Sequence, residues 1–382
     1  MRTRYKALSQ MSISSFDGVV PEVPGISVDN FESLNKRAYF LTHCHRDHTQ
    51  GLTSQQLQKY LEESDVFIYM SELSAAIVEA TNDFVCIKSH VKILKLGVKQ
   101  LIKLPATDHH RELYIEVITI PAGHCFGSVM FLFQTPTKTV LFTGDFRLSV
   151  NDVSKLGHLH TKEGDPMTID KMYVDTTFLN ENYEEFPKRS DSVDSAVYEI
   201  KKFMETSSDN NVALHTSARF GYEYVFNELF KQLNMKVYVN ESDWALYRSY
   251  KDLVPGVTND YTSTRIHKCW NRNEKYAHKC LPFDSSTKKF LYVHFSAMKW
   301  DQFGVEDLTY QKSNNRIDVC FPTHCSKNEV IYFISYFAAK EVKGFPNEYV
   351  ADCNCNNKKP VGFKFAKKKF GLRRCNGKGS IN

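Results

Sequence analysis

The sequence predicts a mixed α/β fold that carries reactive side chains at the ends of its strands. Two observations lead to this prediction. Short runs rich in β-branched and aromatic residues alternate with segments of helical periodicity, and several of these runs end in histidine or aspartate. From about residue 190 the helical patterns become longer, and we expect a second α/β lobe there. With 382 residues, of which 42% are hydrophobic, the chain is long enough to bury sizeable cores.

In the first part of the chain, four expected strands lead into residues that can act as ligands. They cover residues 38–42, 113–121, 139–143 and 171–174, and lead to His43, His124, Asp145 and Asp175. Helices are expected over residues 54–63 and 71–81. Loops at strand ends are free to hold reactive side chains, so we expect the functional site there.

The second part of the chain has the same alternation with longer helices. We expect helices over residues 191–206 and 222–233, strands over 236–239 and 290–295, and a last helix over 327–340. These elements are enough for an α/β lobe of its own.

The segment His43–His48 has the pattern H-x-H-x-D-H directly after an expected strand. Its four potential ligands are His43, His45, Asp47 and His48, in a chain with only 14 histidines. On an extended-to-helical turn, the first two project together while the last two turn aside, so one segment can serve two adjacent metal positions. The alternative is a histidine-rich surface loop. A carboxylate such as Asp145 can bridge two metal ions, which a neutral imidazole does not do.

These residues match the metallo-β-lactamase pattern, and the flanking motifs resemble the Artemis-like DNA-repair nucleases of its β-CASP branch. The motifs are ISVDNF (26–31), AYFLTHCHRDH (38–48), PAGHC (121–125), GSVMFLFQ (127–134), TGDFRL (143–148), VDTTF (174–178) and FGYEYVF (220–226). The resemblance runs from about residue 14 to 350 and implies an αββα sandwich with an inserted β-CASP α/β lobe. The implied metallo-β-lactamase domain covers residues 1–175 and 319–357, the β-CASP domain covers 176–318, and a disordered basic tail covers 358–382.

The resemblance also implies a role for each matching residue. The implied metal ligands are His43, His45, Asp47, His48, His124, Asp145 and Asp175. Asp29 would orient the metal site, and His324, in the motif PTHCS, matches a later β-CASP histidine; catalysis would rest on Asp29, Asp47, Asp175 and His324. We expect one or two Zn²⁺ ions, with Mg²⁺ or Mn²⁺ as alternatives for activity. Metal-bound water, with a pKa of about 7, supplies a nucleophile for phosphodiester hydrolysis.

A second, structural zinc site is expected in the lobe. His267, Cys269, His278 and Cys280 form two H-x-C arms, and on extended chain the side chains of each arm point to one face. Artemis-like enzymes have a similar His₂Cys₂ site, but one of its histidines lies on an earlier strand, where this chain has Tyr238. His278 would be its substitute. The alternative is two buried thiols and two surface histidines.

The surplus of positive charge lies in the C-terminal tail. Nine Lys and Arg residues and no acid follow Cys353. The charge of this segment, +9, exceeds the net charge of +5 of the whole chain. We expect a disordered basic arm that contacts nucleic acid, with Lys367, Lys368 and Lys369 as candidates, or one that serves nuclear import. The alternative is a merely solvated terminus. Gly221 and Tyr222 are further candidates, because they open a helix whose N–H groups can face a phosphate; an ordinary helix start is the alternative.

The resemblance implies a metal-dependent DNA nuclease, acting as a 5′-exonuclease and as a structure-selective endonuclease on hairpins and overhangs in double-strand break repair by end joining. Its partners would be DNA ends and a DNA-dependent protein kinase or end-joining factors. We expect a nuclear monomer with reduced thiols and no membrane span. Two alternatives stay open: an RNA-processing β-CASP nuclease, which the FGYEYVF match disfavours, and a non-catalytic DNA-binding or scaffold protein.

Overall fold

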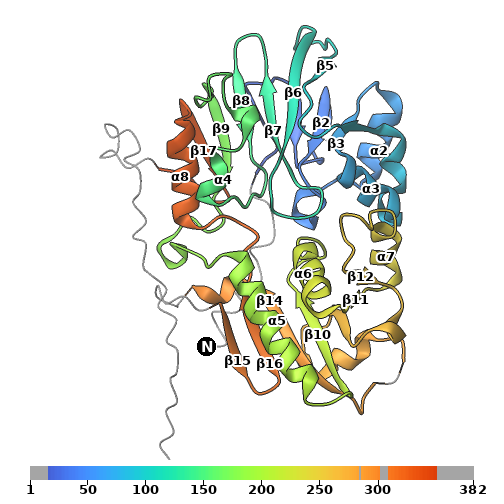
Figure 1. Cartoon of the computed structure of the whole chain (residues 1–382). Coiled ribbons are helices and arrows are strands. Elements are labelled where there is room, and N and C mark those ends of the chain that lie inside the picture. Colours follow the sequence, from blue (N-terminus) through green and yellow to red (C-terminus); the bar gives the residue numbers. More distant parts are fainter. Residues whose placement is uncertain (1–15, 284, 302–308, 351–382) are drawn as a thin grey trace, which may run out of the picture. The chain divides into compact units, whose positions relative to one another are not determined.

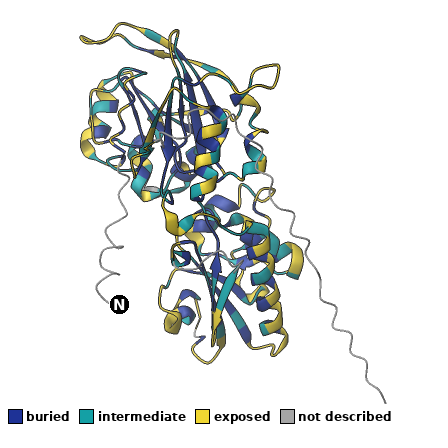
Figure 2. Ribbon diagram, turned by 90° about the vertical axis from the view of Figure 1, so that its left-hand side faces the viewer, coloured by how far each residue is buried: buried dark blue, intermediate teal, exposed yellow. Residues whose placement is uncertain are grey.

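Three β-sheets carry the fold, with helices packed on their faces (Figure 1). The computed structural model describes residues 16–283, 285–301 and 309–350, and the described residues up to Tyr349 belong to one compact unit. The mixed α/β class predicted from the sequence is confirmed. Figure 2 shows that buried residues concentrate along the strands, whereas exposed residues mark outer helices and loops.

Two of the sheets face each other. The four-stranded sheet is parallel and has the order β1 (Ile26–Val28), β2 (Ala38–Leu41), β3 (Ile68–Ser71), β4 (Val91–Leu94). The six-stranded sheet has the order β17 (Glu341–Phe345), β9 (Lys171–Asp175), β8 (Thr139–Phe142), β7 (Val129–Gln134), β6 (Leu113–Pro121), β5 (Gln100–Leu104). Phe40 packs edge-on against Phe131 and Phe133 across the interface. The buried cores of both inner faces form one cluster.

Helices cover the outer faces of these two sheets. The buried leucines of α2 (Gln55–Glu63) pack with η2 (Asn82–His90) on the four-stranded sheet. Helices α4 (Val150–Val153) and α8 (Lys327–Phe337) pack on the six-stranded sheet. The result is an αββα sandwich. Its last strand, β17, pairs with β9 in parallel, so the chain returns to this sheet after building the third one.

The third sheet has seven strands. Its order is β12 (Val257–Thr258), β11 (Val237–Tyr238), β13 (Ile266–Cys269), β10 (Asn210–Thr216), β14 (Lys289–Ser296), β16 (Arg316–Cys320), β15 (Tyr310–Ser313), and only β15 is antiparallel to its neighbour. Helices α5 (Arg189–Glu205) and α6 (Glu223–Leu233) pack against one face through a large apolar cluster. The remaining elements are α3 (Glu72–Ala80), α7 (Glu241–Tyr247), η1 (Arg46–His48), η3 (Gly157–Leu159), η4 (Glu181–Tyr183), η5 (Tyr261–Ser263), η6 (Glu274–Cys280) and η7 (Met298–Trp300).

Local capping explains where the expected helices begin and end. The hydroxyls of Ser54 and Ser71 accept the N–H groups of the first turns of α2 and α3, so each serine caps its helix from the preceding position. Ser326 and Glu329 form a capping box at the start of α8. That helix ends at Phe337 and not at residue 340 as expected, because Ala338 adopts the left-handed conformation with φ of 45°.

No helix among the described residues is long and apolar enough to cross a membrane.

Candidate metal centre

The predicted ligands follow the ends of strands of the sandwich. Asp29 follows β1, His43 lies just beyond β2, and His124 lies beyond β6. Asp145 comes after β8, and Asp175 is the last residue of β9. Because β1 and β2 are parallel, as are β8 and β9, these ends share an edge within each sheet. The loops beyond that edge bring the side chains together.

The histidines converge on one carboxylate oxygen, Oδ2 of Asp145. It lies 3.3 Å from Nε2 of His48, 3.5 Å from Nε2 of His124, 3.6 Å from Nε2 of His43 and 3.9 Å from Nδ1 of His324. Burial opposes ionisation of Asp145, but the surrounding imidazoles, that of His48 foremost, hold the pKa of its carboxyl well below its usual range. An ionised carboxylate therefore lies at the middle of a histidine cluster.

Asp29 orients two of these histidines. Its Oδ2 accepts a hydrogen bond from Nδ1 of His48 at 2.8 Å and another from the hydroxyl of Thr42 at 2.6 Å. The Thr42 hydroxyl oxygen in turn lies 3.0 Å from Nδ1 of His43. Since both Nδ1 atoms donate to oxygen, both Nε2 atoms keep the lone pair that a metal ion needs.

Two backbone carbonyls orient the other two histidines. Nε2 of His45 donates to the carbonyl of Phe220 at 3.2 Å, and Nδ1 of His124 donates to the carbonyl of Thr323 at 2.8 Å. The opposite nitrogens, Nδ1 of His45 and Nε2 of His124, face each other at 2.9 Å. Two lone pairs at this distance repel each other unless a cation lies beside them.

The side chains present fit a metal ion. Nε2 of His43 is buried and has no hydrogen-bond partner, although a buried nitrogen without a partner is costly. Burial lowers the pKa of His43 and of His124 well below the ordinary value, so both imidazoles are neutral, as ligation requires. The described ligand atoms of the centre fall into four overlapping groups within 4.8 Å, which are His43 with His45, His124 and Cys125; Asp47 with His48 and Asp145; Asp29 with His43 and His48; and His124 with Asp145 and His324. Imidazole and carboxylate donors suit zinc and other first-row metals.

Asp175 and His324 form a pair at the edge of the cluster. Nδ1 of His324 lies 2.8 Å from Oδ2 of Asp175, and Oδ1 of Asp175 accepts two hydrogen bonds from Thr177. None of the clusters of possible metal ligands among the described residues contains Asp175, whereas His324 lies in such a cluster with His124 and Asp145. The metal role of Asp175 stays a prediction, and its observed contact is with His324.

Three features of the centre were not predicted. Cys125 lies in the histidine group, and its position next to His124 in PAGHC was the available signal. The carbonyls of Phe220 and Thr323 orient ligands. Both residues lie in motifs that were identified from the sequence. Every residue has a backbone carbonyl, however, so residue type does not reveal such a contact.

The expected phosphate contacts at Gly221 and Tyr222 are not supported by the geometry. The Gly221 N–H already donates to the carboxylate of Glu223 at 2.9 Å. The Tyr222 side chain is buried, and its hydroxyl accepts a hydrogen bond from the N–H of Ser217. The ordinary helix start, with Tyr222 preceding α6, describes this segment better. Lys367, Lys368 and Lys369 lie outside the described residues.

Three of the four predicted structural zinc ligands come together. His267, Cys269 and Cys280 form one buried group, and the two sulfur atoms lie 3.1 Å apart. His278 is not in this group, because η6 turns the chain between the two arms and the extended spacing assumed for them does not hold. Tyr238, on β11, is the register partner of His267 on β13, so it stands beside the site where a fourth ligand is needed.

The chain is similar to nucleases and DNA-repair proteins over much of its length. "Protein artemis" of Rattus norvegicus is 31% identical over 346 residues, which are 88% of this chain and 49% of that protein. "DNA cross-link repair protein pso2/snm1" of Schizosaccharomyces pombe is 28% identical over 271 residues, 69% of this chain and 44% of that protein. "5' exonuclease Apollo" of Mus musculus is 31% identical over 189 residues, 48% of this chain and 31% of that protein. The chain thus spans about half the length of the artemis proteins that it matches.

The fold is shared more widely than the sequence. A crystal structure of a protein of unknown function from Enterococcus faecalis V583 superposes with a TM-score of 0.52 at 14% identity, over 80% of this chain and 74% of that one. No family model matches the chain. The fold, the motifs at its strand ends and the similarity over 88% of its length agree, and the chain belongs to the Artemis-like group in the β-CASP branch of the metallo-β-lactamase superfamily.

Proposed function

We propose that this chain is a metal-dependent DNA nuclease that hydrolyses phosphodiester bonds in DNA repair. The observation that carries the proposal is the convergence of oriented histidines on the Asp145 carboxylate. The names of the related proteins, which include a DNA cross-link repair protein and a 5′ exonuclease, support this choice among metal-dependent hydrolases.

The residues divide into two ligand sets. His43, His45 and His124 would hold one metal ion, and Asp47 with His48 would hold the other, with Asp145 between them. When bound, the metal supplies an activated water and neutralises charge on the phosphate. We propose Zn²⁺ for these positions, with Mg²⁺ or Mn²⁺ as alternatives that support activity.

The remaining polar residues would position substrate and ligands. Asp29 holds His48 directly and His43 through Thr42. His324, held by Asp175, stands at the open edge of the centre and would contact a phosphate or leaving-group oxygen. No Ser or Cys nucleophile is then needed.

We further propose 5′-exonuclease activity and endonuclease cutting of hairpins and overhangs during end joining, in the nucleus. A DNA-dependent protein kinase or end-joining factors would be partners of this activity. The corresponding domain limits are 1–175 and 319–357 for the metallo-β-lactamase domain, 176–318 for the β-CASP domain and 358–382 for a basic tail.

A single experiment tests these proposals together. Purified protein is incubated with 5′-labelled hairpin, overhang and single-stranded DNA, with and without chelator, beside the Asp47→Ala variant. We expect a product ladder that chelator and variant both abolish. Preferential cutting of a matched RNA would favour the RNA-processing alternative, and chelator-insensitive DNA binding without products would favour a non-catalytic protein.

A further inference from the structure

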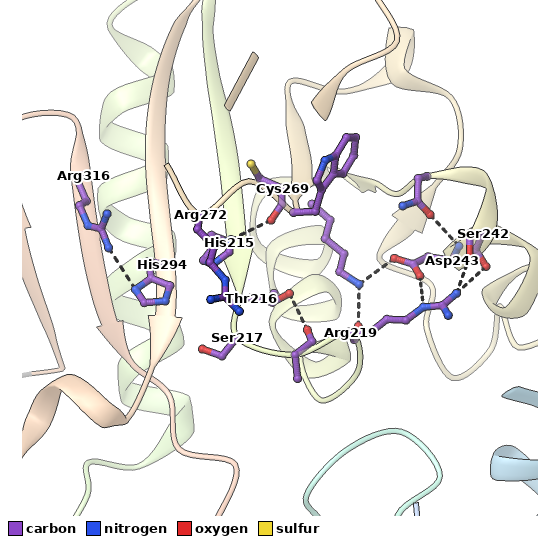
Figure 3. A pocket seen from close by; sticks show the side chains of 14 residues that line it. His215, Thr216, Ser217, Arg219, Ser242, Asp243, Cys269, Arg272, His294 and Arg316 are labelled. Carbon is purple, nitrogen blue, oxygen red and sulfur yellow. Dashed lines mark hydrogen bonds and ion pairs between the residues drawn. The ribbon is translucent and has the colours of Figure 1, made fainter. Parts of the chain in front are cut away.

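A pocket of about 640 Å³ lies in the seven-stranded sheet, apart from the metal centre (Figure 3). Helices α5 and α6 cover the face to which Val212, Leu214 and Val293 point. His215, His294 and Arg316 point to the other face, and they line the pocket. One face of the sheet is therefore apolar and covered, while the other is polar and hollowed around His215, His294 and Arg316 and carries a small apolar cluster with η6.

The pocket occupies the place where open α/β sheets bind ligands. After β10 the chain builds β11, β12 and β13 on one side of β10, and then crosses to build β14 on the other side. Segments that follow the ends of β10, β11 and β13 line the pocket, with Arg219, Asn240 and Arg272 among them. Ligands of doubly wound sheets bind at such a switch point, beyond the carboxyl ends of the strands.

Cations outnumber acids among the residues that line the pocket (Figure 3). On one side the carboxylate of Asp243 is shared by Arg219 and Lys268, each at 2.8 Å. Burial opposes ionisation of Asp243, but Lys268 and Arg219 lower the pKa of its carboxyl, so it stays charged and neutralises only one of the two cations.

On the other side, Asp318 is shared by His294, Lys299 and Arg316, and Arg316 also pairs with Glu274 at 3.2 Å, so the two acids there balance Lys299 and Arg316. Among the described residues, Arg272 has no ion-pair partner at all. The pocket therefore attracts an anion.

Aromatic and acceptor groups complete the lining. Trp270 is 58% exposed at the rim, an unusual state for a tryptophan of a folded domain. Nδ1 of His215 donates to the carbonyl of Cys269 at 3.1 Å, which leaves Nε2 as an acceptor on the pocket side of the sheet. Cations beside an exposed aromatic ring are the combination that binds unpaired nucleotides, through phosphate contacts and base stacking.

The pocket is also connected to the metal centre. Arg219, which lines it, directly precedes Phe220, whose carbonyl holds His45. We infer that this pocket is a subsite for an unpaired nucleotide of the substrate strand, with its phosphate against Arg272 and its base against Trp270. The inference rests on the proposed nuclease function and adds a binding position outside the reacting centre.

The test measures binding by the full chain carrying Asp47→Ala, which prevents cleavage. Its affinity for a labelled thymidine oligonucleotide, for a blunt duplex and for dTMP is compared with Trp270→Ala or Arg272→Ala added. Tyr198→Ala and Arg248→Ala serve as controls, since these residues are exposed and do not line the pocket. We expect each pocket variant to weaken oligonucleotide binding about tenfold, with less than a twofold effect on the duplex. Arg272→Ala alone should reduce the log–log salt slope by about 0.7.

Unchanged oligonucleotide affinity in both pocket variants would overturn the inference. Binding of dTMP as tight as that of the oligonucleotide, and equally sensitive to the variants, would assign the pocket to free nucleotides and refute the strand subsite. Cleavage by the unmutated chain is measured in parallel. If the unmutated chain shows no chelator-sensitive cleavage but oligonucleotide binding still depends on the pocket residues, the proposed nuclease function is wrong and the binding site is supported.

Discussion

Replacing Asp29 by asparagine tests the assignment of the metal centre without touching a ligand. The buried Asp29 carboxylate accepts three hydrogen bonds, at 2.7 Å from the Thr42 N–H, 2.6 Å from the Thr42 hydroxyl and 2.8 Å from His48 Nδ1. Asparagine has the same shape but offers only one acceptor oxygen. Its NH₂ group would face donors in either orientation: the Thr42 hydroxyl and the His48 N–H, which share Oδ2, or the Thr42 backbone N–H at Oδ1.

The expected effect follows from this mismatch. In either orientation His48, and His43 through Thr42, lose the charged carboxylate that holds them, and such changes cost about 10- to 100-fold in metal affinity. This corresponds to about 1.4–2.7 kcal/mol. We expect DNA cleavage to recover in part when metal is added in excess, because every ligand remains in place.

The assay is a competitive zinc titration against a chromophoric chelator, with thermal unfolding to confirm that the variant folds. Asp152→Asn is the matched control, since the Asp152 side chain is half exposed and its carboxylate contacts, within the described part of the chain, Ser149 and Lys155. A metal affinity of Asp29→Asn within twofold of the wild type would refute the orienting role and the tautomers assigned from it.

Three further predictions use other parts of the chain. Asp47→Ala should lower DNA cleavage by about a hundredfold or more while DNA affinity and melting temperature stay near wild type, whereas Cys44→Ala should cleave normally; equal turnover in both variants contradicts the ligand set. Cys280→Ser should remove one zinc equivalent per chain in elemental analysis and lower the melting temperature by on the order of 5 °C, while His278→Ala should change neither; unaltered metal content in Cys280→Ser removes the site. Deleting residues 358–382 should reduce the slope of log duplex affinity against log salt concentration by about 0.9 for each phosphate that this segment neutralises. An unchanged slope would show that the segment does not bind DNA.

The order of strands and helices in the sandwich could be predicted because local pattern and burial agree there. β6 covers Leu113–Pro121 as expected, and α2 and α3 begin right after the serines that cap them. The end of α8 could not be predicted, since alanine is a good helix former and its left-handed conformation at position 338 depends on how the chain turns into β17.

The structural zinc site shows where spacing fails as a guide. The two H-x-C arms suggested four ligands on extended chain, but the second arm lies in η6, and only its cysteine reaches the first arm. Whether a side chain meets a partner eleven residues away depends on the turn between them, and here Asn271 and Asn273 shape that turn by accepting backbone N–H groups two residues further on.

The sequence alone determined which residue types could build a metal centre and that they follow strands, because a strand and the ligands after it are contiguous in the chain. Only the tertiary structure decided how they act together. His324 and Asp175 form a hydrogen bond although they are 149 positions apart in the sequence. Backbone carbonyls that are distant in the sequence determine which ring nitrogens of His45 and His124 stay free. The sharing of Asp243 and Asp318 likewise joins separate elements: Asp243 on α7 meets Lys268 on β13, and Asp318 on β16 meets His294 on β14 and Lys299 on η7. The physical reason is that hydrogen-bond direction and charge excess depend on distances between side chains, and these distances are set by packing.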